Sequence, residues 1–321
     1  MFTITRHLPI NAATTALRED VLQGLTAAQK SLPPKWFYDA RGSELFEEIT
    51  HLPEYYPTNA EREILAAHST EIAAAIAVHT LVELGSGSSE KTRLLLTALR
   101  ENGNLRRYVP VDVSESALRS AATGLLKNYQ NLAIHALVAD FQSGFVVPPT
   151  DGPMMLAFLG GTIGNFFPDE RAHFLASIRD MSQPGDALLL GTDLVKDEQT
   201  LVAAYNDVTG VTAAFHKNLL SVLNRELAAD FNPEMFEHVA LWNAESEWIE
   251  MRLRSLRQQT INFPTLGLSV PFARDEELRT EISAKFRKEG IRAELAAAGY
   301  TLKYWWTDVA ERYALSLSVV G

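Results

Sequence analysis

The fold is decided by the segment Thr80-Leu81-Val82-Glu83-Leu84-Gly85-Ser86-Gly87-Ser88-Ser89. Its first five residues form an apolar run of strand length. Its glycines favour a turn, because glycine has no Cβ atom and accepts positive φ angles. A helical pattern follows over Lys91 to Leu99, with Leu95 and Leu99 on one face. The order strand, glycine turn, helix predicts the start of a βαβ unit.

The same unit recurs on the C-terminal side of this segment. After a strand candidate at Tyr108 to Val113, Ser114 is a good N-cap for a second helical pattern, and a third lies near Asp169 to Met181. The other strand candidates are Leu132 to Val138, Met154 to Leu159 and Ala187 to Thr192. Strands that alternate with helices predict a parallel sheet with right-handed crossovers. We therefore expect an α/β, doubly wound, Rossmann-like fold.

The pattern changes after Lys196. A helical stretch near Val211 to Ala228 precedes three segments of period-two alternation, which favour antiparallel strands, at 236–242, 248–256 and 266–272. The earlier pattern then returns, with a helix near 287–298 and strands at 301–307 and 314–320. We expect an accessory α+β domain, helical over its first part, of residues 1–60 and 197–285, inserted into a doubly wound domain of residues 61–196 and 286–321.

Charge and composition exclude several classes of function. The 321 residues carry 29 Lys plus Arg and 40 Asp plus Glu, and the net charge of −11 would repel nucleic acid. The absence of cysteine excludes disulfides, thiolate nucleophiles and cysteine-based metal sites. The eight histidines show no ligand spacing, so we expect no metal. No segment is long and apolar enough for a signal peptide or a membrane span. We expect a cytoplasmic monomer without nucleic-acid or membrane partners.

Informative residues follow the strands that we predict. Ligands of open α/β sheets bind beyond the carboxyl ends of the strands, where Gly85 lets a ligand approach the backbone. Asp112 ends the second strand, where a carboxylate can accept hydrogen bonds from both ribose hydroxyls. Asp140 and Phe141 end the third, and they suit the amino group and the plane of an adenine. Each has a structural alternative, as a turn, a helix cap or an ordinary strand end, but together they favour a nucleotide-like ligand.

Glu90 distinguishes between nucleotide ligands. The dinucleotide fingerprint G-x-G-x-x-G needs a third glycine beneath a pyrophosphate, and Glu90 occupies that place. Its size and charge therefore argue against a nicotinamide-dependent oxidoreductase. The acid-x-Gly-x-Gly turn resembles instead the first motif of class I S-adenosylmethionine-dependent methyltransferases, and this resemblance implies S-adenosylmethionine as the cofactor. A non-catalytic nucleotide-binding or scaffold protein is a third possibility for the chain.

Longer motifs carry a more specific resemblance. They are Lys35-Trp36-Phe37-Tyr38-Asp39, Pro53-Glu54-Tyr55-Tyr56-Pro57, Glu83-Leu84-Gly85-Ser86-Gly87-Ser88-Ser89-Glu90-Lys91-Thr92, Leu159-Gly160-Gly161-Thr162-Ile163-Gly164-Asn165-Phe166 and Gly191-Thr192-Asp193-Leu194-Val195-Lys196. With them the chain, from about Leu32 onward, is similar to the histidine Nα-methyltransferases of the ergothioneine pathway.

This resemblance implies the transfer of three methyl groups to the α-amino group of free L-histidine, giving hercynine and S-adenosylhomocysteine. It implies that the doubly wound domain binds the cofactor and the inserted domain the substrate. The resemblance implies that the cofactor is contacted by Gly85, Lys91, Asp112, Asp140 and Phe141. Histidine contacts fall to Tyr55, Asn165, Tyr205, Glu281 and Ser283. An N-methyltransferase for another aromatic amino acid or small amine is the alternative, because few side chains retune a pocket.

The chemistry of these residues suits histidine. Asn165 and Tyr205 are neutral donors for its carboxylate, which keeps a strong cation away from the positive sulfonium. Glu281 and Ser283 lie two residues apart, so on an extended segment they can face one way and hold the two imidazole nitrogens. The alternative for Glu281 is a solvated carboxylate in an acidic stretch. We expect Met251 to line the same pocket.

The amine must lose a proton before it is methylated. We expect Tyr38 to be the catalytic residue, and backbone carbonyls near Gly160 and Gly161 or a chain of water are alternative acceptors. The glycines at Gly160 also bring the backbone next to the place of the reacting group, so we include Gly160 among the substrate contacts.

Overall fold

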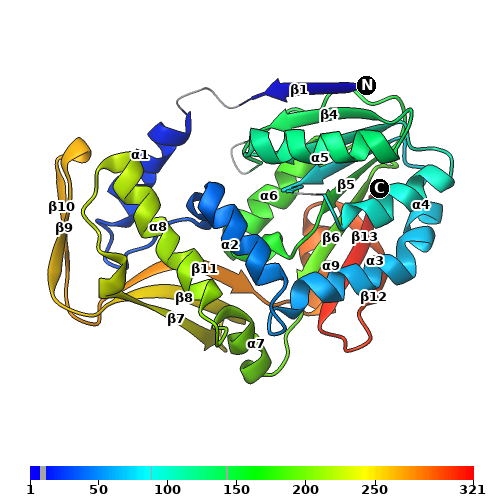
Figure 1. Cartoon of the computed structure of the whole chain (residues 1–321). Helices are drawn as coiled ribbons and strands as arrows, with labels where there is room; N and C mark the ends of the chain where they lie inside the picture. The colour runs from blue at the N-terminus through cyan, green and yellow to red at the C-terminus, as the bar shows by residue number, and fades with distance from the viewer. Residues whose placement is uncertain (8–11, 88, 142–143) are drawn as a thin grey trace. The chain divides into compact units, whose positions relative to one another are not determined.

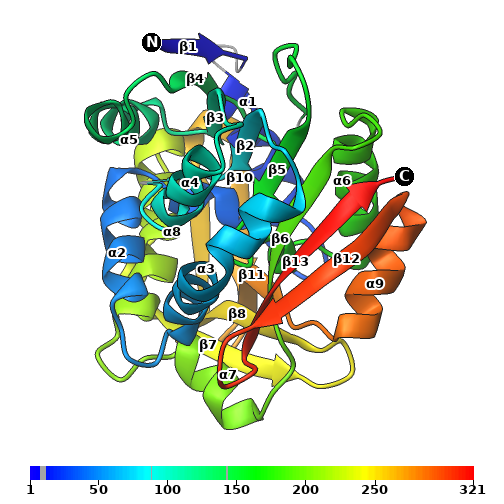
Figure 2. The same cartoon turned by 90° about the vertical axis from the view of Figure 1, so that its right-hand side faces the viewer.

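The computed structural model describes residues 1–7, 12–87, 89–141 and 144–321. Ser88 of the glycine turn lies outside the described residues. The chain divides into two compact units; Figure 1 labels most of their elements, and Figure 2 labels β2 and β3. Unit 1 comprises Met1–Pro9, Pro57–Val195 and Phe286–Gly321, and unit 2 comprises Ile10–Tyr56 and Lys196–Lys285.

Unit 1 is built on a sheet that has, within the described ranges, eight strands in the order β1-β4-β3-β2-β5-β6-β13-β12. The strands are β1 (Phe2–Arg6), β2 (Thr80–Leu84), β3 (Arg107–Asp112), β4 (Ala133–Val138), β5 (Met154–Phe158), β6 (Ala187–Asp193), β12 (Tyr300–Thr307) and β13 (Tyr313–Val320). From β1 to β6 all neighbours pair in parallel. From the central pair of β2 and β5, the chain adds β3 and β4 on one side and β6 on the other. This strand order confirms the predicted doubly wound fold.

The last two strands depart from the all-parallel pattern. β13 pairs antiparallel with both β6 and β12. A short turn joins β12 to β13, and such a connection allows only an antiparallel pair. The sheet is therefore mixed at this edge, where Figure 2 shows helix α9 (Lys288–Ala297) beside β12.

Helices cover both faces of the large sheet. Met155 of β5 belongs to a buried cluster with residues of α3 (Tyr56–Ala75), α4 (Thr92–Glu101) and α5 (Glu115–Asn128). Phe158 faces the other side of the same strand, because it lies an odd number of residues away, and its ring is 4.9 Å from Phe174 of α6 (Pro168–Asp180). This burial on two faces explains the uniformly apolar strands that predicted the sheet.

The N-terminus differs from the prediction, which placed the first 60 residues in a helical part of the accessory domain. Phe2–Arg6 is a strand that pairs with β4, with Phe2 opposite Ile134. Met1–Pro9 accordingly belongs to unit 1. Only Phe2 and Ile4 pack on a buried cluster, beside Ala136. The alternation of Phe2 and Ile4 with Thr3 and Thr5 is typical of a half-buried strand, but it spans only five residues ahead of a long helical stretch.

Unit 2 contains the antiparallel strands that the period-two segments predicted. Its three-stranded sheet has the order β11-β8-β7, and β9 and β10 form a separate pair. The strands are β7 (Phe236–Asn243), β8 (Trp248–Ser255), β9 (Gln259–Phe263), β10 (Leu268–Phe272) and β11 (Glu277–Ala284). The helices of unit 2 are α1 (Ala12–Gly24), α2 (Ala40–Thr50), α7 (Glu198–Tyr205) and α8 (Val211–Leu227). Short 3-10 helices of this unit are η1 (Pro34–Phe37), η3 (Pro233–Met235) and η4 (Pro264–Leu266). Unit 1 contains the 3-10 helix η2 (Thr162–Asn165). Leu219 and Leu223 of α8 share a buried core with Leu253 of β8.

Candidate functional site

The turn after β2 exposes backbone to a ligand. Gly85 and Gly87 have φ angles of 66° and 48°, in the left-handed region that favours glycine. A Cβ atom on Gly87 would meet nothing within 4 Å, so that side of the turn is open. The hydroxyl oxygen of Ser86 is buried and has no hydrogen-bond partner among the described residues. The turn thus offers free space and an unused buried polar atom, which is what a bound polar ligand would satisfy.

Asp112 holds this turn in place. Its carboxylate accepts hydrogen bonds from the backbone N–H of Gly87 at 3.0 Å and of Ser114 at 2.9 Å. Ser114 is the N-cap of α5, as predicted, since its Oγ accepts from the N–H of Ala117. Burial raises the pKa of Asp112, against the pull of these N–H groups. A carboxylate has about four lone-pair positions, so further ones stay available for ribose hydroxyls.

Three predicted cofactor residues and one predicted substrate residue lie at the ends of neighbouring strands of one sheet. Asp112 is the last residue of β3, and the cofactor residues Gly85 and Asp140 and the substrate residue Gly160 come one or two residues after the carboxyl ends of β2, β4 and β5, which together with β3 form adjacent parallel strands. The ring of Phe141 stands near the turn, because a Cβ on Gly85 would lie 3.7 Å from it. The fold therefore brings these side chains to one edge, at the point where the strand order reverses and ligands of such sheets bind.

Glu61 is a buried carboxylate that the sequence did not single out. One of its oxygens accepts from the N–H of Gly160 at 2.7 Å and from the hydroxyl of Tyr313 at 2.9 Å. The other accepts from the ammonium of Lys91, a predicted cofactor residue. Glu61 thus fixes Lys91 beside Gly160. It lies on helix α3, and its partners are up to 252 residues away, so no local pattern marks it.

Glu83, the acid of the turn motif, is a brace beneath the turn. It is buried on β2 and accepts hydrogen bonds from the hydroxyls of Thr92 and Tyr108. Tyr108 also contacts the hydroxyl of Ser89 at 2.9 Å. Burial raises the pKa of Glu83 to about 7. This carboxyl group therefore joins the turn to α4 and β3.

In unit 2, an aromatic cluster contains several of the predicted substrate residues. Tyr55, Tyr205 and Met251 pack together, and the ring centroids of the two tyrosines are 6.0 Å apart in an edge-on arrangement. The ring of Tyr38 lies 5.5 Å from that of Phe46, which is itself 6.4 Å from Tyr55. The four rings form a continuous series that ends at Tyr205.

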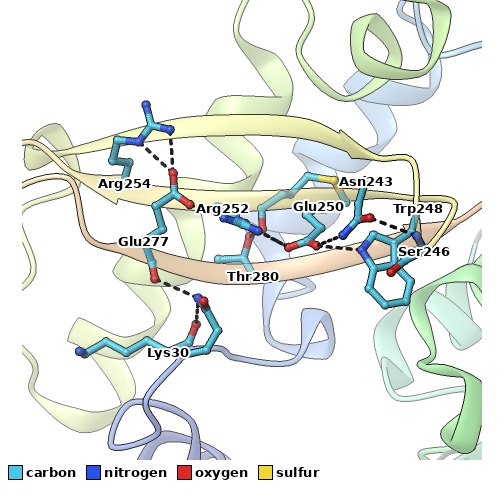
Figure 3. Close-up of polar contacts among 11 residues, drawn as sticks. Lys30, Asn243, Ser246, Trp248, Glu250, Arg252, Arg254, Glu277 and Thr280 are labelled. Atoms are coloured by element: carbon cyan, nitrogen blue, oxygen red, sulfur yellow. Dashed lines mark hydrogen bonds and ion pairs between the residues drawn. The ribbon is translucent and has the colours of Figure 1, made fainter. Parts of the chain in front are cut away.

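A β-bulge at Thr280 directs Glu281. In the pairing of β11 with β8, Glu281 lies opposite Met251, and the register shifts between Arg279 and Glu281. Because neighbouring residues of a strand face opposite sides, the extra residue turns Glu281 and Ser283 to the face that carries Met251. Figure 3 shows Thr280 against β8, where its hydroxyl donates to the carbonyl of Met251 at 3.1 Å.

Two stacked histidines support this face. The Nε2 atom of His216 lies 3.6 Å from a carboxylate oxygen of Glu281, and its Nδ1 contacts the hydroxyl of Thr280 at 2.9 Å. His238 stacks on His216 at 4.7 Å, and its Nε2 contacts the carbonyl of Tyr205 at 2.8 Å. Burial lowers the pKa of both imidazoles, so they are neutral near pH 7. They connect Glu281 and Tyr205 through the core of unit 2.

The opposite face of the same sheet carries a closed charge network. Figure 3 shows Glu250 accepting hydrogen bonds from Trp248 and Arg252. Glu277 accepts from Arg252 and Arg254. Each of these two carboxylates is paired with arginine, so we interpret this face as structural, with the ion pairs joining β8 to β11. Glu277 and Glu281 thus lie on one strand but in contrasting surroundings.

Two classes of site are not found in the part of the chain that the structure describes. No group of three or more His, Asp or Glu side chains there could hold a metal ion. None of the described helices is long and apolar enough to cross a bilayer.

Comparison with known proteins places the chain in a family. The family model for "Histidine-specific methyltransferase, SAM-dependent" matches residues 17–320. The chain belongs to this family. A histidine N-alpha-methyltransferase of Mycolicibacterium smegmatis is 54% identical over 316 residues, and one of Mycobacterium tuberculosis is 53% identical over 315, each covering 98% of both chains. A 4-dimethylallyltryptophan N-methyltransferase of Epichloe festucae var. lolii is 28% identical over 311 residues, 90% of each chain.

Family membership confirms the resemblance that the motifs predicted. It establishes an S-adenosylmethionine-dependent methyltransferase with a small-molecule substrate. It therefore rules out a nicotinamide-dependent oxidoreductase and a non-catalytic scaffold.

Proposed function

We propose that this protein methylates the α-amino group of L-histidine three times with S-adenosylmethionine, giving hercynine and S-adenosylhomocysteine, as in the ergothioneine pathway that the motifs imply. The family match over residues 17–320 carries this proposal. The polar face of β11, with Glu281 and Ser283 beside Tyr205, supports histidine as the substrate.

Unit 1 is the cofactor unit in this proposal. When bound, S-adenosylmethionine supplies a methyl group on a positive sulfonium. Asp112 would hold the ribose hydroxyls, and Asp140 and Phe141 the adenine. The open backbone at Gly85 and the side chain of Lys91 would hold the rest. The unused hydroxyl of Ser86 and the space beside Gly87 fit such a ligand.

Unit 2 supplies most of the histidine contacts. Tyr205 donates to the substrate carboxylate, and the motifs assign Asn165 of unit 1 to the same group. Glu281 accepts from one imidazole nitrogen and Ser283 donates to the other, which leaves neither ring nitrogen without a partner. Tyr55 and Met251 form apolar walls, in keeping with their shared cluster.

Methyl transfer to an amine needs alignment, exclusion of water and removal of one proton. We propose that the proton leaves to water, with the hydroxyl oxygen of Tyr38 or the carbonyl oxygen of Gly160 accepting the hydrogen bond that orients the amine. This chemistry uses no metal ion. A monomeric state and a cytoplasmic location stay predictions from the sequence.

A second candidate substrate is a tryptophan derivative. The observation in its favour is the fungal relative whose name specifies 4-dimethylallyltryptophan. An indole cannot offer both a ring donor and a ring acceptor, so it could not use both Glu281 and Ser283 as an imidazole can. The polar face of β11 therefore favours histidine.

The test is a direct competition between amino acids. The purified protein is incubated with S-adenosylmethionine and an equimolar mixture of L-histidine, L-tryptophan and L-phenylalanine, and the products are identified by mass spectrometry. We expect mono-, di- and trimethylated histidine and at most traces of methylated tryptophan or phenylalanine. Methylated tryptophan as the main product would contradict the proposal.

A further inference from the structure

Lys285 is a buried lysine that neither the motifs nor the proposed reaction uses. It is 3% exposed and directly follows β11. Its ammonium donates to the hydroxyl of Tyr205 at 2.9 Å and to that of Ser283 at 2.7 Å. The two hydroxyl oxygens are 2.8 Å apart. One ammonium thus contacts both of the hydroxyls that are assigned to the substrate.

The arrangement fixes the direction of these hydrogen bonds. An ammonium group only donates, so the oxygens of Tyr205 and Ser283 must accept from Lys285. Their own protons then point away from Lys285. At most one of these protons can lie between the two hydroxyls, so the other is directed away from the pair. When substrate acceptors are present, both protons can turn outward, because Lys285 still satisfies both oxygens.

The charges along β11 match those of free histidine. Glu281, Ser283 and Lys285 occupy alternate positions, which face one side of an extended chain and lie roughly 7 Å apart. The face thus runs from a carboxylate through a hydroxyl to an ammonium. Histidine has an imidazole at one end and a carboxylate at the other. In the proposed function Tyr205 donates to the carboxylate, so the ammonium, 2.9 Å from the Tyr205 hydroxyl, would act on the carboxylate through that hydroxyl. A buried cation thus stands behind the neutral donors that the sequence predicts.

We propose that Lys285 is a positioning residue, which orients the hydroxyls of Tyr205 and Ser283 as donors to the carboxylate and imidazole of histidine. This inference rests on the proposed function. It assigns to Lys285 an effect on histidine that acts through two hydroxyls and leaves the cofactor untouched.

A double-mutant cycle tests this inference. The affinity for L-histidine is measured by calorimetry, on protein saturated with S-adenosylhomocysteine, for Lys285→Met, for Tyr205→Phe with Ser283→Ala, and for the triple variant. We expect Lys285→Met alone to weaken histidine binding by about 10- to 100-fold, the loss expected for charge-assisted hydrogen bonds, with the affinity for S-adenosylhomocysteine unchanged. In the background without the two hydroxyls, the same substitution should weaken binding less than about threefold, because Lys285 has lost the groups through which it acts.

Full additivity in the cycle, or wild-type histidine affinity in Lys285→Met, would overturn the inference. If Lys285→Met does not fold, Lys285→Arg is used in the same cycle, where non-additivity supports the inference and additivity overturns it. The unmodified protein is the control for the proposed function. If it does not methylate histidine, the proposed function fails, whereas methylation with an additive cycle rejects only the role of Lys285.

Discussion

The two units build their candidate sites in different ways. In unit 1 the candidate site consists of a glycine turn and strand ends, so Gly85, Asp112 and Asp140 are each placed by the end of a strand in one parallel sheet. In unit 2 the site consists of side chains from α7, β8 and β11, brought together by tertiary packing. The comparison teaches that a common cofactor is recognised by a recurring backbone arrangement, and a particular substrate by side chains that can vary.

Removal of the strand-end acid in unit 1 should have the largest effect. Asp112→Ala loses the proposed ribose contacts and the two N–H bonds that hold the turn. Each charge-assisted hydrogen bond is worth about 1.5–3 kcal/mol, so we expect a loss of about 100-fold in affinity for S-adenosylhomocysteine, measured by calorimetry. Asp151→Ala, at an exposed position, is the control for lost charge. Unchanged affinity in a folded Asp112→Ala protein would reject the ribose assignment.

In unit 2 the acid proposed to contact a ligand is Glu281, and its removal should weaken the use of the substrate without changing the affinity for the cofactor. Glu281→Ala leaves the imidazole N–H without its acceptor, so we expect kcat/KM for histidine to fall about 10- to 100-fold. The kcat/KM for tryptophan should fall less than that for histidine. Adding Met251→Val, which enlarges the pocket, should raise the kcat/KM for tryptophan. Glu277→Gln, on the opposite face of the same strand, is the matched control. Full preference for histidine in the double variant would show that Glu281 does not bind the imidazole.

The two units should respond to pH in opposite directions. Glu83 has a pKa of about 7 in the folded chain against an ordinary value of 4.5, so the free energy of unfolding falls as the pH rises between these values. Burial lowers the pKa of His216 well below 6.5, so the free energy of unfolding falls as the pH falls below 6.5, where the imidazole of the unfolded chain takes up a proton.

Glu83→Gln should remove the first of these two dependences. Its melting temperature relative to the wild type should rise by a few degrees from about pH 5 to about pH 8, as measured by calorimetry. Glu101→Gln, an exposed acid, should show no such trend. A difference that is constant with pH would mean that Glu83 is not protonated in the folded chain.

Sequence alone predicts unit 1 better than unit 2, for a physical reason. The apolar strand Thr80–Leu84 and its glycines specify their own conformation, and doubly wound sheets bind ligands at one known edge. The strand β1 was missed because its partner β4 is far away in the sequence and only two of its side chains pack on a cluster. Its alternation of apolar residues and threonines is typical of a strand, but it is only five residues long.

In the sites, the residues that support others were the ones missed. In the sequence Glu61 is indistinguishable from an ordinary acidic residue of a helix. Its partners Lys91, Gly160 and Tyr313 surround it only in the folded chain. The bulge at Thr280 has no signature in the sequence, yet it decides which face Glu281 takes. Such residues depend on contacts across the chain, and spacing along one strand or helix does not reveal them.

We propose that the side chains of unit 2 select the substrate and those of unit 1 hold the cofactor. The most direct test is calorimetry of Tyr205→Phe with both ligands, L-histidine and S-adenosylhomocysteine, next to Tyr304→Phe as an exposed control. Loss of the hydroxyl removes one donor to a charged group, so we predict about tenfold weaker histidine binding and unchanged binding of S-adenosylhomocysteine. Equal losses for both ligands, or no loss for histidine, would contradict this division between the two units.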